Sequence, residues 1–422
     1  MAKTTVIKCG RLITGKDEKV LSNKAVVIEG NSITAVGDPK TLNIPPDATV
    51  IEAGNWTLMP GLMDIHVHLG AIVDPNEPNT MVAMLNTPPP LLTLHAVKNA
   101  RLMLEAGFTT VRDMTGYNYT MGVEMVSLRK GIEMGLVRGP RVFASGWVTP
   151  TAGHLDMGMP ATWRRREDET ADGPDEVRKM TRKFIRNGVD VIKTASSGGG
   201  GGYTEEVWWR NYTVEELQVI SEEAHAYRKT VAVHAHTPEG IKRAIRGGCD
   251  TVEHGTEVDQ EVLDLFLESG VFLVPTLSVA SERALAGRKK GGADAHVLRK
   301  HQESVEKKER NFRKAHEAGV KIACGTDTYR ALREYMGQNA YELELMVKYG
   351  MSPMRAIIAA TKTAAEALGR AETLGTIEAG KLADMILVDG DPSTDVTILE
   401  NTSRILAVIK DGQVEVDRRP AK

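Results

Sequence analysis

Cysteine, aromatic side chains and long apolar runs are all scarce in this sequence of 422 residues. Its three cysteines, Cys9, Cys249 and Cys324, are far apart and odd in number, which argues against a disulfide framework and a CxxC-type zinc site. No apolar run approaches the roughly 20 residues of a transmembrane helix, and the N-terminus lacks the apolar centre of a signal peptide. We therefore expect no membrane partner and, for the chain as given, a cytoplasmic location; a leader removed from the chain would change the location.

An excess of basic charge is also lacking, because 53 Lys and Arg residues are balanced by 56 Asp and Glu residues, for a net charge of -3. This balance gives no basic field for nucleic acid, so nucleic acid is not an expected partner. Two catalytic motifs are missing as well. The glycine run 198–202 lacks the Gly-Lys-Ser/Thr ending of a phosphate loop, and without GxSxG a nucleophile elbow has no support.

What the sequence does contain is a strand pattern at both ends and an alternation of strand-like and helix-like runs between them. The strand-like runs of the middle are 60–68, 109–115, 141–147, 189–196, 230–236, 250–255, 271–276 and 320–326. The helix-like runs are 94–106, 122–135, 174–187, 213–228, 238–247, 259–269, 296–318 and 352–368. The predicted fold is α/β, a (β/α)8 TIM barrel over 60–369 plus a small β-sandwich formed by residues 1–59 and 370–422.

The first chemical motif is His66-Val67-His68, at the end of the first predicted barrel strand. The strand period of two places both imidazoles on one face, where they can bind one ion. A pair of surface histidines is the alternative, and HxH alone is a weak signal. Its position after a β-rich segment and the residues MPGLMD favours a metal site.

Lys193 lies near the end of the fourth predicted strand and precedes a loop rich in Ser and Gly. An ammonium group facing the barrel mouth would be costly to desolvate, whereas a neutral lysine can react with CO2 to give a carbamate that bridges two divalent ions. A lysine that reaches solvent is the alternative, and spacing alone favours it. The ligand candidates on neighbouring strands reverse that preference.

Those candidates are His234 and His236 on the fifth predicted strand, His254 on the sixth and Asp327 in CGTDT after the eighth. Each histidine alone is most simply a core histidine, but three at adjacent strand ends favour a metal site, and one of the 234/236 pair suffices as a ligand. Asp327 can take a proton from water and pass it to a leaving amine. A helix N-cap is the alternative for Asp327.

Two loops of the predicted barrel mouth carry candidate substrate contacts, because such loops usually determine substrate choice. His154 lies on the loop after the third strand, where its polar surroundings favour a substrate contact. Tyr203 and Tyr212 flank the Trp208-Trp209 pair on the loop after the fourth strand. For these tyrosines and tryptophans, simple loop packing is an equally good interpretation.

The segments PGLMDIHVHL, VIKTASSGG, VAVHAHTPEGIKRAIRGGCDTVEHGT and GTDT together resemble the amidohydrolase superfamily, over nearly the whole chain. They look most like the branch of imidazolonepropionase-like and Xaa-Pro dipeptidase-like proteins. That branch includes binuclear metal carboxypeptidases acting on dipeptides and N-acyl amino acids, and ochratoxin-hydrolysing amidohydrolases. The resemblance implies the same barrel and terminal β-sandwich, and homo-oligomers are common in the superfamily.

The resemblance also implies two divalent metal ions, with zinc the expected metal. Six side chains match the family's ligands: His66, His68, Lys193, His234, His254 and Asp327. Within this set, Lys193 matches an N6-carboxylysine that bridges both ions. His236 is left near the substrate, and His154 and Tyr212 fall where the branch contacts the α-carboxylate of its substrate.

The implied function is cleavage of the amide bond to a C-terminal amino acid in dipeptides or N-acyl amino acids, with ochratoxin A (to its acid and phenylalanine) as one candidate. Asp327 would pass a proton to the leaving amine, and His236 would donate to the developing oxyanion. A cyclic-amide or imidazolonepropionase-like hydrolase is the alternative. Lys193 counts against mononuclear deaminases, and the complete ligand set counts against a non-enzymatic scaffold.

Overall fold

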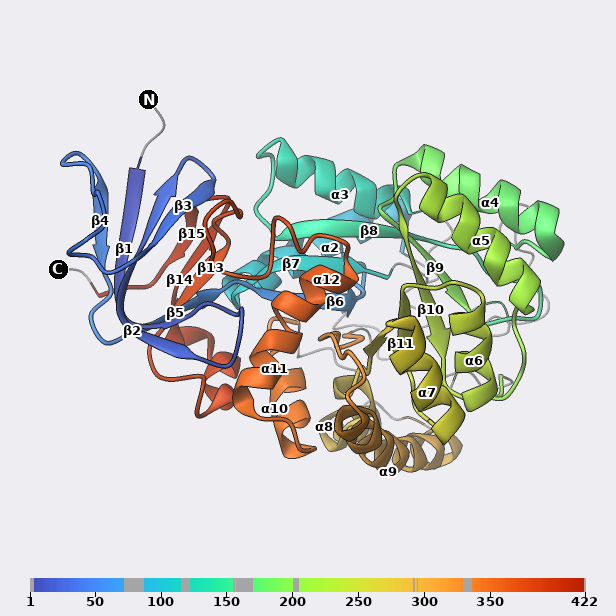
Figure 1. The fold of residues 1–422 in the computed structure, drawn as a ribbon. Helices are drawn as coiled ribbons and strands as arrows, with labels where there is room; N and C mark the ends of the chain where they lie inside the picture. Colours follow the sequence, from blue (N-terminus) through green and yellow to red (C-terminus); the bar gives the residue numbers. More distant parts are fainter. Residues whose placement is uncertain are drawn as a thin grey trace.

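The computed structural model describes residues 4–71, 87–114, 122–154, 156, 170–199, 205–290, 293, 295–328 and 336–420. A parallel sheet surrounded by helices and a second sheet built from both chain ends make up the molecule (Figure 1). This is a mixed α/β architecture, in agreement with the predicted fold class.

The parallel sheet of the described residues has seven strands, in the order β12-β11-β10-β9-β8-β7-β6. Their bounds are β6 Leu62–Val67, β7 Phe108–Asp113, β8 Arg141–Trp147, β9 Val191–Ala195, β10 Thr230–Ala235, β11 Thr251–His254 and β12 Phe272–Val274. Neighbours in space are neighbours in the chain, as expected when each crossover returns beside the preceding strand. All carboxyl ends of the strands therefore lie at one end of the sheet.

The eighth predicted strand, 320–326, is not a regular strand. The segment nevertheless lies between β12 and β6, through single bridges from Ile322 to Leu273 and from Thr328 to Val67. Only isolated bridges occur in this segment, and Asp327, directly after the predicted range, has φ 54°, a left-handed conformation that a strand ladder does not accommodate. The predicted eight-stranded barrel is thus found as a nearly closed seven-stranded sheet with an irregular eighth segment.

Helices cover the outer face of this sheet (Figure 1). Their bounds are α2 Pro89–Glu105, α3 Val123–Glu133, α4 Gly173–Asn187, α5 Val214–Ala226, α6 Pro238–Arg246, α7 Gln260–Ser269, α8 Glu282–Lys290, α9 Ala295–Ala318, α10 Tyr341–Lys348, α11 Pro353–Ala359 and α12 Lys362–Ala367, with 3-10 turns at Ser278–Ala280, Val396–Glu400 and Thr402–Arg404. The sequence did not predict α8 or α10 as separate helices. The predicted helix 352–368 is broken before α12, where Thr361 has φ -137° and ψ -90°.

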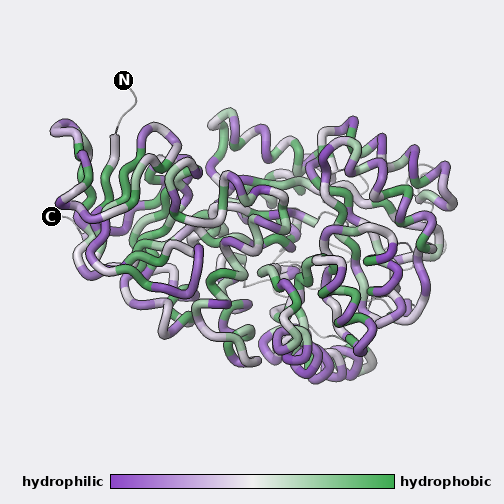
Figure 2. The backbone as a smooth tube through the Cα atoms, viewed as in Figure 1, coloured by the Kyte–Doolittle hydropathy of each residue, from purple (hydrophilic) through white to green (hydrophobic). Residues whose placement is uncertain are grey.

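Figure 2 shows hydrophobic residues along the strands and mainly hydrophilic residues along α9. This pattern is expected where strands are enclosed and a helix presents one face to solvent. Among the described residues, no helix is both long and apolar enough to cross a membrane.

The two chain ends share one eight-stranded sheet, ordered β15-β14-β13-β5-β1-β2-β3, with β4 paired to β1. Its strands are β1 Thr4–Ile13, β2 Val20–Glu29, β3 Ser32–Gly37, β4 Thr49–Glu52, β5 Thr57–Pro60, β13 Met385–Val388, β14 Ile405–Lys410 and β15 Gln413–Asp417. The antiparallel pair β5–β13 joins the N-terminal and C-terminal parts. The association of the two ends agrees with the sequence, whereas the division into two sandwiched sheets and the boundaries near 59 and 370 stay predictions.

A single residue, Gly61, separates β5 of the terminal sheet from β6 of the parallel sheet. A Cβ atom at this position would lie 2.2 Å from Oγ1 of Thr109 on β7, so only glycine allows the two strands to approach this closely. The chain therefore enters the parallel sheet directly from the terminal sheet, and β6 carries the first histidine pair to the far end.

Candidate metal centre

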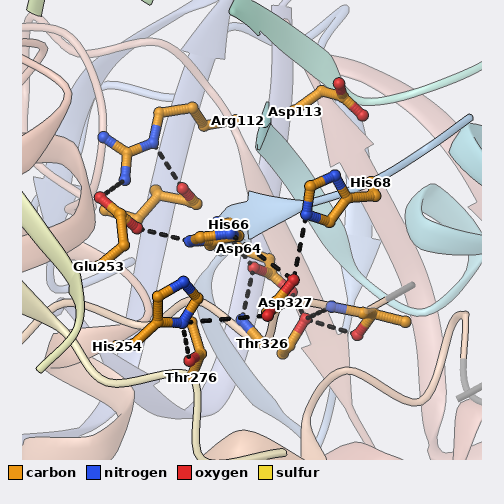
Figure 3. A network of polar contacts seen from close by, with 12 residues as sticks. Asp64, His66, His68, Arg112, Asp113, Glu253, His254, Thr276, Thr326 and Asp327 are labelled. Carbon is orange, nitrogen blue, oxygen red and sulfur yellow. Dashed lines mark hydrogen bonds and ion pairs between the residues drawn. The ribbon is translucent and has the colours of Figure 1, made fainter. Parts of the chain in front are cut away.

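Six of the predicted ligands lie at the carboxyl ends of the parallel strands or in the irregular eighth segment. They are His66 on β6, His68 just after it, Lys193 on β9, His234 on β10, His254 on β11 and Asp327 in the eighth segment. All six residues are less than a tenth exposed, and Asp327, at 9%, is the most exposed of them. Figure 3 shows the side chains of His66, His68, His254 and Asp327 directed toward one another.

One potential ligand group consists of His66, His254 and Asp327, whose ligand atoms all lie within 4.8 Å of one another. The nearest approach of Asp327 is to His68, at 3.1 Å between Oδ1 and Nε2. The corresponding distance from Oδ1 to Nε2 of His66 is 3.7 Å. A carboxylate oxygen and imidazole nitrogens at these separations are suited to a shared divalent ion such as zinc.

A second potential ligand group consists of His234, His236 and His254, again within 4.8 Å. The ring centroid of His234 is 4.5 Å from those of both other rings. His254 belongs to both groups, so the two candidate ion positions are adjacent. The groups could hold metal, but they differ from the predicted sets by including His254 rather than His68 in the first and adding His236 to the second, and the number of ions stays a prediction.

Lys193 lies in the same region and is fully buried. Its Nζ atom has no hydrogen-bond partner within the described part of the chain. Burial lowers the pKa of Lys193 to about 8, although Glu253 and Asp327 act in the opposite direction. A buried amine without a hydrogen-bond partner is unfavourable in free energy. Conversion of the amine to a group that can bind the same metal ions as the histidines would remove this cost.

Burial also keeps the histidines neutral, which is the form that can bind a metal. It lowers the pKa of His66 to about 4 and that of His236 to about 3. The pKa values of His234 and His254 fall well below the usual value for the same reason. The donor set of neutral imidazoles, one carboxylate and one deprotonable lysine therefore fits a pair of divalent ions.

A buried ion pair that the sequence analysis missed lies behind His66. Nδ1 of His66 is 2.6 Å from Oε2 of Glu253, and Arg112 donates to Oε1 of the same carboxylate at 2.7 Å. Burial alone would raise the pKa of Glu253, but Arg112 and His66 hold it at about 2. The carboxylate fixes the Nδ1–H tautomer of His66, so Nε2 is the atom left for a ligand. Glu253 directly precedes His254 in the DTVEHGT segment, which was its only local signal, whereas Arg112 lies on a strand that is not a neighbour of β11 and had none.

A second missed contact, through Asp64, holds the eighth segment in place. Asp64 accepts hydrogen bonds from the backbone N–H groups of His66 and Thr326, both at 3.1 Å, and from Oγ1 of Thr326 at 2.7 Å. Asn339 donates to the same carboxylate at 2.8 Å. Asp64 thus ties β6 to the segment that carries Asp327. Its place two residues before the HxH motif was the only local signal.

Three residues around the centre have positive φ although none is glycine: His254 at 74°, Thr276 at 48° and Asp327 at 54°. Such conformations cost on the order of 1–3 kcal/mol each and persist where the surrounding structure enforces them. Their concentration at the strand ends indicates that the surrounding contacts hold these side chains in place although the backbone there is strained.

Of the predicted substrate contacts, His154 lies beside the centre. Its ring stacks on that of His234 with 4.0 Å between centroids, and its Nδ1 is 2.9 Å from Oε1 of Glu205. Trp147, which the sequence analysis did not single out, is opposite Lys193 in the strand ladder, and Nζ of Lys193 is 5.2 Å from the centroid of its ring. His154 and Trp147 thus border the second ligand group.

The other predicted loop contacts are placed differently. Tyr212 is fully buried and its hydroxyl donates to the carbonyl of Ala171 at 2.7 Å, so this hydroxyl serves loop packing and its substrate contact gains no support. Trp208 is 68% exposed. Tyr203 lies outside the described residues.

The chain is similar to several known proteins over most of its length. Residues 57–414 match the model of the amidohydrolase family. The ochratoxinase of Aspergillus niger is 33% identical over 435 residues, covering 98% of this chain and 87% of the relative; its crystal structure has a TM-score of 0.85, with 32% identity over 99% of this chain and 96% of that one. The crystal structure of a Xaa-Pro dipeptidase with bound methionine in the active site has a TM-score of 0.88, with 35% identity over 98% and 99% of the two chains. An imidazolonepropionase of Geobacillus sp. (strain WCH70) is 24% identical over 429 residues, covering 94% of this chain and 91% of the relative.

Proposed function

Since the chain belongs to the amidohydrolase family, we propose that it is a binuclear metal hydrolase that cleaves the amide bond to the C-terminal amino acid of dipeptides or N-acyl amino acids. The resemblance inferred from the sequence is confirmed, as is the prediction of an enzyme acting on amide bonds. One observation supports the proposal of a binuclear centre in particular. The Nζ atom of Lys193 is buried beside the candidate ligands, and it has no hydrogen-bond partner within the described part of the chain. A bridging carbamate at this atom explains why a lysine is tolerated there.

The proposed ligands divide into two sets. His66, His68 and Asp327 would hold the first ion, and His234 and His254 the second, with N6-carboxylysine at Lys193 shared by both. Zinc suits a set of imidazole and carboxylate donors. Two divalent ions in such a site supply water that ionises near neutral pH and polarisation of the scissile carbonyl.

Two roles would fall to side chains of this protein: transfer of a proton and stabilisation of the oxyanion. Asp327 lies 3.1 Å from His68 within the cluster, where its carboxylate can take the proton of the attacking water and return it to the leaving amine. Nδ1 of His236 is 2.7 Å from Oγ1 of Thr256, so Nε2 is the atom free to donate to the developing oxyanion. His154, whose ring stacks on that of His234, is the proposed contact for the α-carboxylate of the substrate.

The relatives support the substrate class. Two of them are named as an ochratoxinase and a Xaa-Pro dipeptidase, and the latter holds methionine, a free amino acid, in its active site. An amino acid is the product expected from the proposed cleavage. Ochratoxin A is therefore one candidate substrate among N-acyl amino acids, and homo-oligomer formation stays a prediction.

The test is release of free amino acids from dipeptides and N-acyl amino acids by zinc-loaded protein, each substrate being paired with its C-terminal amide analogue. Turnover of the free acids but not of the amides is the expected result. Equal turnover of both would discard the α-carboxylate contact. Turnover restricted to cyclic amides or to imidazolonepropionate would replace the proposal with the alternative of a cyclic-amide hydrolase. No turnover of peptide-like or of cyclic amides would contradict both hypotheses.

A further inference from the structure

Two buried charges lie behind the loop that follows β12, beyond the set of proposed ligands. Lys308 on α9 is 3% exposed, and Glu342 on α10 is fully buried. Among the described residues, no hydrogen bond or ion pair joins either of them to a proposed ligand, although the charge of Lys308 acts through space on His254 and Asp327. Both form hydrogen bonds to the loop 275–278, so their hydrogen bonds can reach the centre only through that loop.

Lys308 uses its three N–H donors on three acceptors of this loop. Nζ donates to the carbonyl oxygens of Pro275 at 3.0 Å and Thr276 at 2.7 Å, and to Oγ1 of Thr276 at 2.8 Å. A lysine ammonium has no acceptor capacity, so the direction of all three hydrogen bonds is fixed. One residue, Thr276, therefore receives two of the three.

Glu342 holds the next residues of the loop by accepting hydrogen bonds, whereas Lys308 donates them. Its carboxylate accepts from the backbone N–H groups of Leu277 and Ser278, both at 2.7 Å, and from Oγ of Ser278 at 2.6 Å. The loop is thus fixed by a cation at its carbonyl side and an anion at its N–H side. This is the physical reason why Thr276 can persist at φ 48°.

Thr276 passes this constraint to the metal centre. Its Oγ1 is 2.8 Å from Nδ1 of His254 (Figure 3), the histidine that belongs to both ligand groups. Because Lys308 and His254 share the same hydroxyl oxygen, a displacement of Thr276 would turn the imidazole that both candidate ions need.

We infer that Lys308 is a positioning residue for both ions, acting through Thr276 on His254. This inference rests on the proposed function, because it presupposes that His254 binds metal. Removing the ammonium group leaves two buried carbonyls and one hydroxyl without their donor, and the loop is then free to relax from its strained conformation. We expect Zn²⁺ affinity to fall about 10–100-fold, as for other outer partners of metal ligands.

The experiment is a double-mutant cycle on the full chain with Lys308→Met and Thr276→Val, read out as Zn²⁺ stoichiometry and as Zn²⁺ affinity in competition with a chromogenic chelator. Each single variant should lose affinity, and the double variant should lose little more than the worse single one, since both interrupt the same connection. Thr276→Ser, which retains the hydroxyl, should bind Zn²⁺ nearly as the wild type does.

A matched control separates positioning from general stability. Lys242 is also nearly buried, at 6% exposure, and forms ion pairs with Glu239, Asp259 and Glu261 between α6 and α7, none of which is a proposed ligand. Lys242→Met should lower the unfolding temperature while leaving Zn²⁺ affinity unchanged.

The outcomes that overturn the inference are distinct. Wild-type Zn²⁺ affinity in Lys308→Met, or additive losses in the double variant, would exclude the connection through Thr276. If Lys308→Met does not fold, the Thr276→Val and Thr276→Ser pair decides, and equal affinity in these two variants overturns the inference. A wild-type protein that binds no Zn²⁺ would overturn the proposed function as well.

Discussion

The two halves of the candidate centre are held in place by different kinds of contact. In the first half, the ligands near Asp327 are supported by buried charges: Glu253 behind His66, and Asp64 behind the eighth segment. In the second half, the direct hydrogen-bond partners of His234 and His236 are neutral. His236 contacts the hydroxyl of Thr256 at 2.7 Å, and His234 contacts the carbonyl of Gly198 at 3.2 Å.

This difference separates a rigid side of the centre from an adaptable one. A hydrogen bond to a charged group contributes about 1.5–3 kcal/mol, against about 0.5–1.5 kcal/mol for a neutral pair. We therefore infer that the first half is held more rigidly, whereas the histidines of the second half, bordered by His154 and Trp147, have weaker supports. His254 lies between the halves, and its orientation by Thr276 affects both.

The largest expected effect comes from removing Lys193, the proposed bridge between the two ions. Lys193→Ala deletes the proposed bridge, and we expect kcat/KM to fall on the order of 10⁴-fold, with less than two ions bound per chain. Metal analysis and steady-state kinetics measure both quantities. Partial recovery with added formate or acetate would support the carbamate, while full activity without such carboxylates would rule it out.

A somewhat smaller loss is expected in the rigid half. Asp327→Asn keeps the size of the side chain but removes the proton acceptor, so kcat should fall about 10²–10⁴-fold. Zinc content must be measured in parallel, because the amide is also a poorer ligand. A variant that binds two ions and retains near-normal kcat would contradict the proposed proton transfer.

Glu253→Gln tests the charged support itself. The amide still fills the site, but His66 and Arg112 lose their shared anion, so Zn²⁺ affinity should fall about 10–100-fold. Breaking the buried pair should also lower the free energy of unfolding by about 3–5 kcal/mol, measurable by urea denaturation.

Glu223→Gln is the control for this change, since Glu223 pairs with Arg178 and Arg182 at the surface, where an ion pair contributes about 1 kcal/mol or less. Equal effects of the two substitutions would mean that the buried carboxylate gives the first half no special rigidity.

The sequence predicted candidate ligands in both halves, which the structure brings together, but it did not predict how differently the two halves are supported. His66 and His68 were recognisable because strand periodicity places them on one face and parallel strands end on one side. Arg112 and Glu253 lie 141 positions apart and meet only inside the folded sheet, so no local pattern indicates their contact. The same holds for Asn339, which reaches Asp64 from a loop before α10.

The eighth segment illustrates a related limit. Its apolar run predicts a strand, and the chain does run between β12 and β6. The left-handed backbone of Asp327 follows from the contacts of Asp64 and the proposed ligands, none of which is local in sequence. Local propensity therefore placed the segment, while tertiary contacts determined its shape.

The smallest expected effect concerns the adaptable half. Thr256→Val removes the hydroxyl at Nδ1 of His236 with little change in volume, and the loss of one neutral hydrogen bond of about 1 kcal/mol predicts a roughly fivefold fall in kcat. Zn²⁺ affinity should stay within about twofold of the wild type, because His236 is not a proposed ligand. Measuring both for Thr256→Val and Glu253→Gln gives the sharpest comparison of the halves: the first should alter turnover without metal loss, and the second should alter metal retention. If Thr256→Val instead releases metal, His236 is a ligand, and the second ion depends on the full group of three histidines rather than on His234 and His254 alone.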